Sequence, residues 1–299
     1  STERTAINTK ISIYGIIKNS FADLKTATDK LTNLSNLNPL KASSSDDKIV
    51  SATASAANAK GSYSIEVSQL AKAQSVATLG VATADTVVGT GSLTITLGSY
   101  DSNTNTFTDN ADKTPVTINI GAGQQTLEGV RQAINEADAG VTAFIVNDGA
   151  GSRLVLTSKE TGAVNGFKLE VADDDGNNTN VAGLSRLAYD PTALAGSGKN
   201  ADTLQAAQNA NFTINNLPVS KASNSVSDAV EGLTLNLKAV TTTPINLEVG
   251  LDDAALKTTL DGFVTAYNKI RGNLKDQQQK DATLSRETTP SSLERGLRN

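Results

Sequence analysis

Oxygen-bearing side chains gather in residues 173–180, which read Asp-Asp-Asp-Gly-Asn-Asn-Thr-Asn. Carboxylate and amide oxygens are the ligands that hard cations require, so this run is a candidate calcium loop. An aspartate pair precedes Gly176 as in an EF-hand, but the same spacing puts Val171 at the first ligand position and Ala182 at the closing Glu position. The run is therefore interpreted as a solvated turn, and no metal site is expected.

The chain contains no histidine and no cysteine. These absences remove the commonest general base, the Ser–His and Cys–His nucleophile pairs and the usual zinc ligands. Two carboxylates could still hydrolyse a glycoside, but sugar-binding clefts are normally rich in aromatic side chains, and only 4% of these residues are aromatic. No glycine-rich nucleotide loop or Gly-x-Ser-x-Gly element is present. We expect no catalytic or cofactor-binding residues, no enzyme activity, and a structural or interaction role.

Charge and hydropathy argue against nucleic acid and the membrane interior as partners. The formal net charge is −5 and the pI is near 4.9, with Lys and Arg scattered along the chain, so nucleic acid is not expected as a partner. No run of about 18 apolar residues occurs, and the N-terminus has no hydrophobic signal region, so we expect no membrane insertion and no conventional secretory signal.

Residues 7–34 carry apolar side chains at alternating steps of three and four, with one break at Ala27 and Thr28. This spacing predicts an amphipathic helix about 40 Å long at 1.5 Å per residue. Its narrow apolar stripe is typical of a coiled-coil seam and not of a helix that covers a sheet. The candidate seam residues in this segment are Ile11, Tyr14, Ile17, Phe21 and Leu24.

A second segment, residues 256–274, is the expected helical partner because its apolar side chains recur at steps of four and three without a break. Its candidate seam residues are Leu256, Leu260, Phe263, Tyr267, Ile270 and Leu274. We therefore predict that the two ends of the chain pack as an antiparallel coiled-coil leg. The alternative, that each helix belongs to a compact bundle with no larger role, stays open.

Three alternating runs within residues 211–249 predict strands that share one apolar face, with residues 62–68 as the nearest upstream strand of matching pattern. Between the first two runs, a cap-forming Asn224, apolar residues at helical spacing and a final Gly232 predict a short helix. The apolar positions are Phe212, Ile214 and Leu217, then Leu233, Leu235 and Leu237, then Ile245, Leu247 and Val249.

The same order of elements recurs upstream, with a predicted helix at residues 126–135 and a strand after Gly140. Turn-forming residues at 98–114 and 148–151 predict hairpins, so an antiparallel, sandwich-like domain is expected. The five strand candidates are residues 92–97, 116–120, 141–146, 153–157 and 167–171.

Together these patterns predict an α+β, multidomain fold, in which an antiparallel coiled-coil helical leg carries two β-rich antiparallel head domains, the second inserted into the first. Residues 188–203 contain Pro and Gly turn signals and are expected to form a flexible exit from the inserted domain. The expected parts are residues 1–48 (first part of the leg), 49–82 (first part of the head domain), 83–204 (inserted outer head domain), 205–250 (second part of the head domain) and 251–299 (second part of the leg, with a polar tail).

Four stretches carry a resemblance to a known family: KISIYGIIK at residues 10–18, KGSYSIEVSQLAKAQ at 60–74, NSVSDAVEGLTLNL at 224–237 and DGFVTAYNKI at 261–270. In this order they resemble the leg helix, the first head strand, the flagellin-type motif and the returning leg helix of the flagellar filament-capping proteins, also called hook-associated protein 2. The likeness covers nearly the whole chain and weakens over residues 83–106 and after Leu274.

The resemblance implies a non-enzymatic cap subunit that forms a ring at the filament tip, retains exported flagellin and promotes its folding and polymerisation. The implied partners are further copies of the chain and flagellin, with hook–filament junction proteins, an export chaperone and host mucus as further candidates. The implied location is the extracellular tip of a bacterial flagellum, after export by the flagellar type III system, and the chain is expected to be a fragment lacking both ends of a longer protein. A surface adhesin and a flagellin or hook–filament junction protein are the alternatives.

Overall fold

A computed structural model describes residues 2–298 of the chain, which divides into two compact units. The first, here called the helical unit, comprises Ser1–Lys41, Ala54–Lys60 and Val249–Asn299. The second, the β-rich unit, comprises Ala42–Thr53 and Gly61–Glu248. Segments from both ends of the chain therefore build the helical unit.

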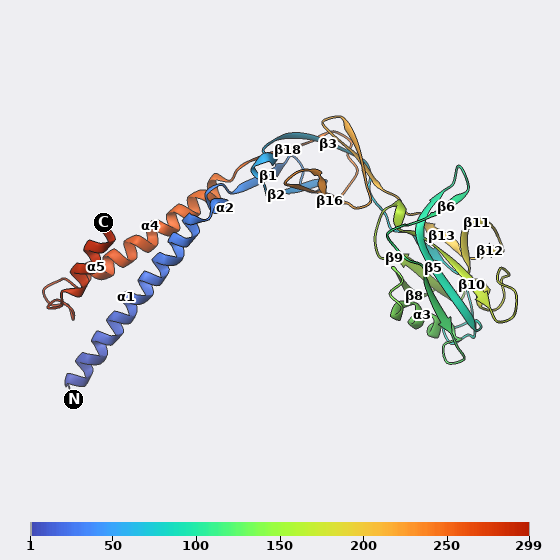
Figure 1. The fold of residues 1–299 in the computed structure, drawn as a ribbon, viewed down its shortest axis with the longest axis horizontal. Coiled ribbons are helices and arrows are strands. Elements are labelled where there is room, and N and C mark those ends of the chain that lie inside the picture. The colour runs from blue at the N-terminus through green and yellow to red at the C-terminus, as the bar shows by residue number, and fades with distance from the viewer. Residues whose placement is uncertain (1, 299) are drawn as a thin grey trace. The chain divides into compact units, whose positions relative to one another are not determined.

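Two long helices form most of the helical unit: α1 spans Thr2–Thr32 and α4 spans Asp253–Asp276 (Figure 1). Both helices that the apolar spacing predicted are thus confirmed. Helix α4 begins where the Asp252 side chain accepts a hydrogen bond from the backbone N–H of Ala255, which satisfies a backbone donor that the helix itself cannot pair.

Three short helical elements complete this unit. Asn33 caps α2, Leu34–Leu37, directly after α1 ends. The 3-10 turn η1 spans Ala57–Ala59. Helix α5 spans Thr289–Arg298, within the segment that was expected to be a polar tail.

The β-rich unit contains two sets of sheets, and the first set is here called the head body. It consists of a five-stranded sheet with the order β1-β18-β3-β14-β15 and a three-stranded sheet with the order β16-β17-β2. The strand bounds are β1 Leu40–Ser44, β2 Val50–Ala54, β3 Gly61–Gln69, β14 Ala210–Ile214, β15 Leu217–Lys221, β16 Ser225–Val230, β17 Leu233–Leu237 and β18 Ile245–Leu251.

Strand β14 pairs antiparallel with β3, which confirms the upstream partner that the sequence pattern predicted. The alternating burial is also confirmed in β17 and β18, where all six predicted apolar positions are buried: Leu233, Leu235, Leu237, Ile245, Leu247 and Val249. The prediction that all three strands share one apolar face is wrong for β17, which lies in the three-stranded sheet, whereas β14 and β18 lie in the five-stranded sheet on either side of β3. Leu217 is 67% exposed, since a two-residue turn at Asn215 and Asn216, both with positive φ, moves it onto the next strand, β15.

The short helix predicted over residues 224–232 is wrong, because Ser225–Val230 forms strand β16. This strand pairs antiparallel with β17, with Val226 opposite Leu235. Gly232 has φ +75 and lies between the two strands. A glycine with positive φ suits a hairpin turn as well as a helix end, and the β-branched Val226 is buried in the pairing.

The second set of sheets is here called the inserted domain, because its strands all lie between β3 and β14 in the sequence. One sheet has the order β12-β11-β10-β5-β6 with β7 paired to β5, and the other has the order β13-β4-β9-β8. The element bounds are β4 Ser75–Ala77, β5 Gly91–Asp101, β6 Thr106–Asp109, β7 Val116–Ile120, α3 Leu127–Glu136, β8 Val141–Asn147, β9 Ser152–Ser158, η2 Ala163–Asn165, β10 Gly166–Asp173, η3 Leu184–Leu187, β11 Tyr189–Ala195, β12 Ser197–Lys199 and β13 Asp202–Gln205.

One apolar cluster fills the inserted domain. It joins Leu93 and Ile95 of β5, Leu154 and Leu156 of β9, and Ile134 of α3, all of which are at most 1% exposed. The five predicted strands are all present as β5, β7, β8, β9 and β10. Their alternating pattern arises because successive side chains of a strand point to opposite faces of its sheet.

The predicted helix–glycine–strand order is confirmed in the inserted domain by α3 and β8. The Thr126 side chain caps α3 by accepting from the N–H of Gly129 at 3.1 Å. Near its other end, the Asn135 carboxamide pairs with both backbone groups of Ala143 at 2.8 Å each. Strand β8 is an edge strand, so this side chain occupies backbone groups that a neighbouring strand would otherwise use.

The flexible exit predicted at residues 188–203 is wrong, because strands β11, β12 and β13 occupy most of it. Tyr189 is buried, and its hydroxyl bonds to the Thr203 hydroxyl at 2.7 Å. Burial raises the pKa of the Tyr189 phenol. Strand β4 pairs with β9 of the inserted domain, so we propose that this domain begins at Ser75 and not at residue 83.

Candidate assembly surface

Helices α1 and α4 pack through an apolar cluster near one end of the helical unit. Ile17 of α1 meets Ile270 and Leu274 of α4, and both α4 residues are 0% exposed. Of the other candidate seam residues, Phe21, Leu24, Leu256, Phe263 and Tyr267 are half-buried, whereas Ile11, Tyr14 and Leu260 are exposed. The rings of Phe263 and Tyr267 stack with centroids 6.3 Å apart.

Two polar contacts fix the alignment of the helices. The Lys269 ammonium donates to the Asp23 carboxylate at 2.8 Å, and the Asn273 amide donates to the Ser20 hydroxyl at 2.8 Å. Residue numbers fall along α1 as they rise along α4, so the helices are antiparallel. The ion pair is more than half exposed and adds little stability, which leaves the apolar cluster as the main source of cohesion.

The tail after α4 covers part of this cluster. Leu284 is 0% exposed and packs on Ile17, Ile270 and Leu274, with Leu293 and Leu297 of α5 beside it. Sequence reasoning missed Leu284, because an isolated leucine in a polar segment carries no periodic signal. The Glu287 carboxylate accepts from the Lys10 ammonium at 2.8 Å and raises the pKa of that lysine.

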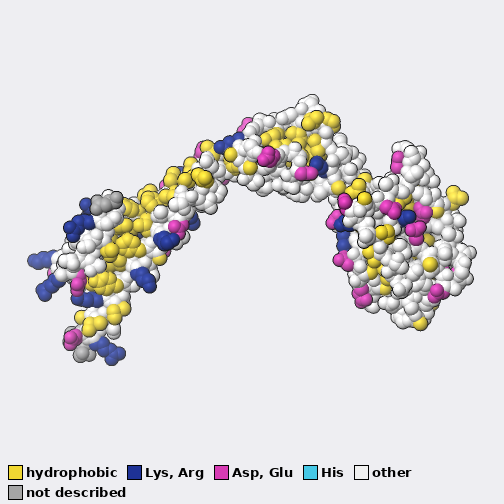
Figure 2. Space-filling model, in the orientation of Figure 1, with side chains coloured by type: hydrophobic (Ala, Val, Ile, Leu, Met, Phe, Trp, Pro, Cys, Tyr) yellow, Lys and Arg dark blue, Asp and Glu magenta, His cyan; other side chains and the backbone are white. Residues whose placement is uncertain are grey.

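Several large apolar side chains are exposed on the two long helices of the helical unit. They include Ile7, Ile11 and Ile16 on α1 and Leu260 and Val264 on α4, with Ile11 64% and Val264 52% exposed. Figure 2 shows apolar side chains gathered along this unit. Large apolar side chains that stay exposed on a helix are candidates for contact with another protein. We call these five residues the candidate assembly surface.

The acidic run at residues 173–180 forms a hydrogen-bonded loop. The buried Asp173 carboxylate accepts from the backbone N–H groups of Asp175 and Ser185 at 3.2 and 2.7 Å. Across residues 2–298, no cluster of three or more acidic, histidine or cysteine side chains is arranged to hold a metal ion. Among the helices of the same residues, none combines the length and the apolar character needed to cross a membrane.

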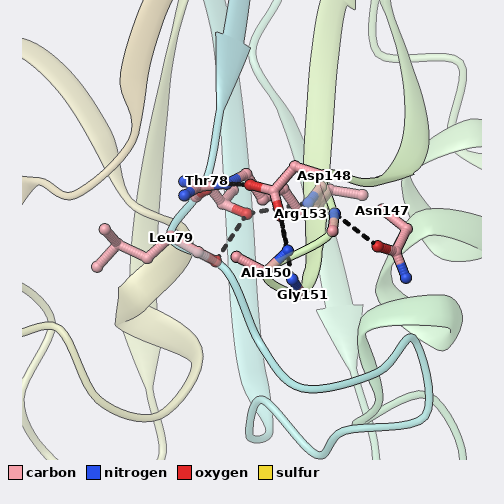
Figure 3. Close-up of polar contacts among 9 residues, drawn as sticks. Thr78, Leu79, Asn147, Asp148, Ala150, Gly151 and Arg153 are labelled. Carbon is pink, nitrogen blue, oxygen red and sulfur yellow. Dashed lines mark hydrogen bonds and ion pairs between the residues drawn. The ribbon is translucent and has the colours of Figure 1, made fainter.

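A second polar cluster lies at the turn between β8 and β9 (Figure 3). The Asp148 carboxylate accepts from the Arg153 guanidinium at 2.6 Å and from the N–H groups of Ala150 and Gly151 at 2.9 and 3.0 Å. Arg153 also donates to the backbone carbonyl of Thr78 at 3.2 Å. These bonds tie the turn to the segment that follows β4, and the Arg153 guanidinium lowers the pKa of Asp148.

We expect Asp148→Ala to loosen this turn, because the amides of Ala150 and Gly151 lose their acceptor and Arg153 loses its ion pair. Amide hydrogen exchange should speed up at these two residues, while α3 keeps its protection. The pKa of Asp148 is lowered in the folded chain, so its contribution to stability is present above the ordinary Asp pKa and is lost as the pH falls through the lowered value. The melting temperatures of parent and variant should therefore converge in acid, and a constant gap would contradict this account.

Three family models match the chain. The model described as "Flagellar hook-associated protein 2 N-terminus" matches residues 1–74, and the model described as "Flagellar hook-associated protein 2 C-terminus" matches residues 207–296. The "Flagellin hook IN motif" matches residues 92–160. This last match includes α3 and β8, whereas the sequence resemblance placed a flagellin-type motif at residues 224–237, which the C-terminal model covers.

A solved structure decides the family. The D1-D2-D3 domains of the flagellar cap protein FliD from Escherichia coli match with a TM-score of 0.77 and 32% identity, over 95% of this chain and 75% of that one. The chain belongs to the flagellar hook-associated protein 2 family. The predicted α+β fold with antiparallel β-rich domains is confirmed by the same likeness.

Other members of the hook-associated protein 2 family agree. FliD from Pseudomonas aeruginosa matches with a TM-score of 0.62 and 34% identity, over 78% of this chain and 98% of that one. The B-type flagellar hook-associated protein 2 of the same species is 35% identical over 285 residues, which are 93% of this chain and 57% of that protein. The chain thus spans little more than half the length of the curated relatives that it matches. These relatives are named as cap or hook-associated proteins, and none of the three family models describes an enzyme.

Proposed function

We propose that this chain is part of a structural cap subunit, which assembles with further copies at the tip of a flagellar filament, retains exported flagellin and promotes its polymerisation. The membership of the hook-associated protein 2 family supports this role, since solved relatives are titled flagellar cap proteins. The observation that carries the proposal is the candidate assembly surface on a pair of rigid helices, because exposed apolar side chains favour contact with another protein.

We also propose that the seam residues predicted from the sequence act in two ways. Ile17, Ile270 and Leu274 hold α1 against α4, whereas Ile11 and Leu260 remain free to contact a partner. Contacts made by a few exposed side chains bury little surface, and interfaces with a small buried area are typically weak and transient. A cap that advances with the growing filament requires such reversible contacts.

A surface adhesin is the second candidate, because the hairpin loops of the inserted domain expose polar side chains that a ligand could contact. A flagellin or hook–filament junction protein is the third, and the match of residues 92–160 to a flagellin motif favours it. The three candidates differ in what the loss of the gene does to filaments and to attachment.

The test is to delete the gene in the bacterium that carries it and to restore the full-length gene on a plasmid. We expect monomeric flagellin in the medium and stunted filaments after deletion, and normal filaments after restoration. Normal filaments with lost surface attachment would instead support an adhesin. Filaments that contain the protein along their shaft would support a flagellin-like role.

Two variants make the test specific to the candidate assembly surface. Ile11→Asp and Val264→Asp put a charge at positions that are already exposed, so we expect both proteins to fold with unchanged helicity. Each should restore filaments poorly, because a carboxylate disfavours an apolar interface. Asn268→Asp, also exposed on α4, is the matched control and should restore normal filaments. Full restoration by both surface variants would contradict the role of this surface.

A further inference from the structure

Two crossing segments, residues 70–73 and 205–209, connect the head body to the inserted domain and are here called the joint. Their only isolated β-bridge among the described residues pairs Lys72 with Gln208, through backbone bonds of 2.9 and 3.2 Å. A pair of short strands with so few ladder bonds has little stability of its own. Other contacts must therefore decide whether the joint is stiff.

Side-chain carboxamides supply such contacts. Asn224, which follows β15 of the head body, accepts from the backbone N–H of Ala71 at 2.7 Å and donates to the carbonyl of the same residue at 2.9 Å. Ala71 is only 4% exposed, so both of its backbone groups need partners. The Asn224 side chain thus makes the two bonds that a neighbouring strand would make.

Glutamine side chains continue this pattern along the joint. Gln208 donates to the carbonyl of Leu70 at 2.8 Å, and Gln205 donates to the carbonyl of Ala73 at 2.7 Å. Asn224 differs from both because it pairs with both backbone groups of its partner and comes from outside the two crossing segments. It therefore links the joint to the head body.

The inserted domain makes a second contact with the head body beside the joint. The Thr161 hydroxyl donates to the carbonyl of Ala222 at 2.7 Å. Gly162 has φ +102, and a Cβ at this position would lie 2.4 Å from the Cβ of Ala222. Only glycine both adopts this positive φ without strain and leaves the space free that a Cβ would fill. A hollow of about 390 Å³ opens next to this contact, lined by Lys159, Glu160, Thr161, Asn165, Ala222 and Ser223.

We propose that Asn224 is a positioning residue that latches the joint and holds the inserted domain in one orientation relative to the head body. The close approach of Gly162 to Ala222 stops the inserted domain from moving further toward the head body at this point. The hollow beside the contact leaves room for the inserted domain to tilt the other way. The two bonds from Asn224 to Ala71 oppose that second movement. Without them the joint becomes a hinge. This inference does not depend on the proposed cap function.

The test variant is Asn224→Asp, which keeps the shape of the side chain and the acceptor for the Ala71 N–H. It loses the donor and places a carboxylate oxygen against the Ala71 carbonyl. The matched control is Asn215→Asp, in the same head body, whose hydrogen bond from the Ser64 N–H uses the acceptor that Asp retains. Both variants add the same charge.

The measurement is the distance between two spin labels in the whole chain. The chain has no cysteine, so labels can be attached at Thr243→Cys in the head body and Ser102→Cys in the inserted domain, both at exposed positions. We expect one narrow distance for the parent and for Asn215→Asp, and the loss of that narrow distance for Asn224→Asp. A merely structural role of Asn224 would lower the melting temperature and leave the distance narrow.

Two results would overturn the latch: a narrow distance that survives in Asn224→Asp, or a parent distance that is already broad. Circular dichroism shows whether the variant is folded. If it is not, Asn224→Ala, which removes both bonds without adding a charge, is measured in its place and judged by the same two results.

Discussion

Ile270→Asp is expected to separate α1 from α4 and to unfold the helical unit. Ile270 is 0% exposed and packs on Ile17, Leu274 and Leu284. Truncating a buried isoleucine to alanine alone costs about 2–5 kcal/mol, and the aspartate adds the cost of a buried carboxylate without a cationic partner. Far-UV circular dichroism should show a loss of helix content, and the helical unit should melt at a lower temperature.

The control for this variant is Asn268→Asp, which adds the same charge two residues away at an exposed position of α4. It should melt like the parent. Phe263→Asp and Tyr267→Asp, at two of the predicted seam positions, should have smaller effects, because both side chains are only half-buried. An Ile270→Asp protein with parental helicity and melting would show that the apolar cluster does not hold the helices.

Gln74→Glu is expected to destabilise the inserted domain strongly at neutral pH. The Gln74 side chain is 6% exposed; it donates to the carbonyl of Phe167 at 3.1 Å and accepts from the N–H of the same residue at 2.9 Å. A glutamate cannot donate when ionised, so the Phe167 carbonyl would face a buried carboxylate. An unpaired buried polar group costs about 1–3 kcal/mol, and a charged group costs more.

The pH dependence of this variant identifies the cause. Burial raises the pKa of the introduced carboxyl above the ordinary Glu value of about 4.3. When protonated, the carboxyl both donates and accepts, as glutamine does. Stability should therefore be near parental below the ordinary value, fall as the pH rises through the raised pKa, and stay low above it.

Thermal melting of Gln74→Glu between acid and neutral pH measures this dependence. Gln279→Glu, at an exposed position after α4, is the control and should follow the parent at every pH. A loss of stability that does not change with pH would show that the lost hydrogen bond matters without any contribution from the buried charge.

The sequence determined the helices and most strands because their patterns are local. Apolar residues at steps of three and four, such as Ile270 and Leu274, define a helix face within one turn, and alternation in β17 defines a strand within five residues. The stretches that resemble a known family are also contiguous in the chain. The resemblance to the hook-associated protein 2 family was therefore visible without any knowledge of tertiary contacts.

Tertiary structure decided the features that depend on residues far apart in the sequence. The pairing of Gln74 with Phe167 joins positions 93 residues apart, and that of Asn224 with Ala71 joins positions 153 residues apart. Residues 225–230 carry local signals for either a helix or a hairpin, and pairing with β17 selects the strand. Likewise, the apolar spacing of a helix does not say which of its apolar residues another segment will cover. Ile270 is buried because α1 and the tail pack on it, whereas Ile11 is left exposed.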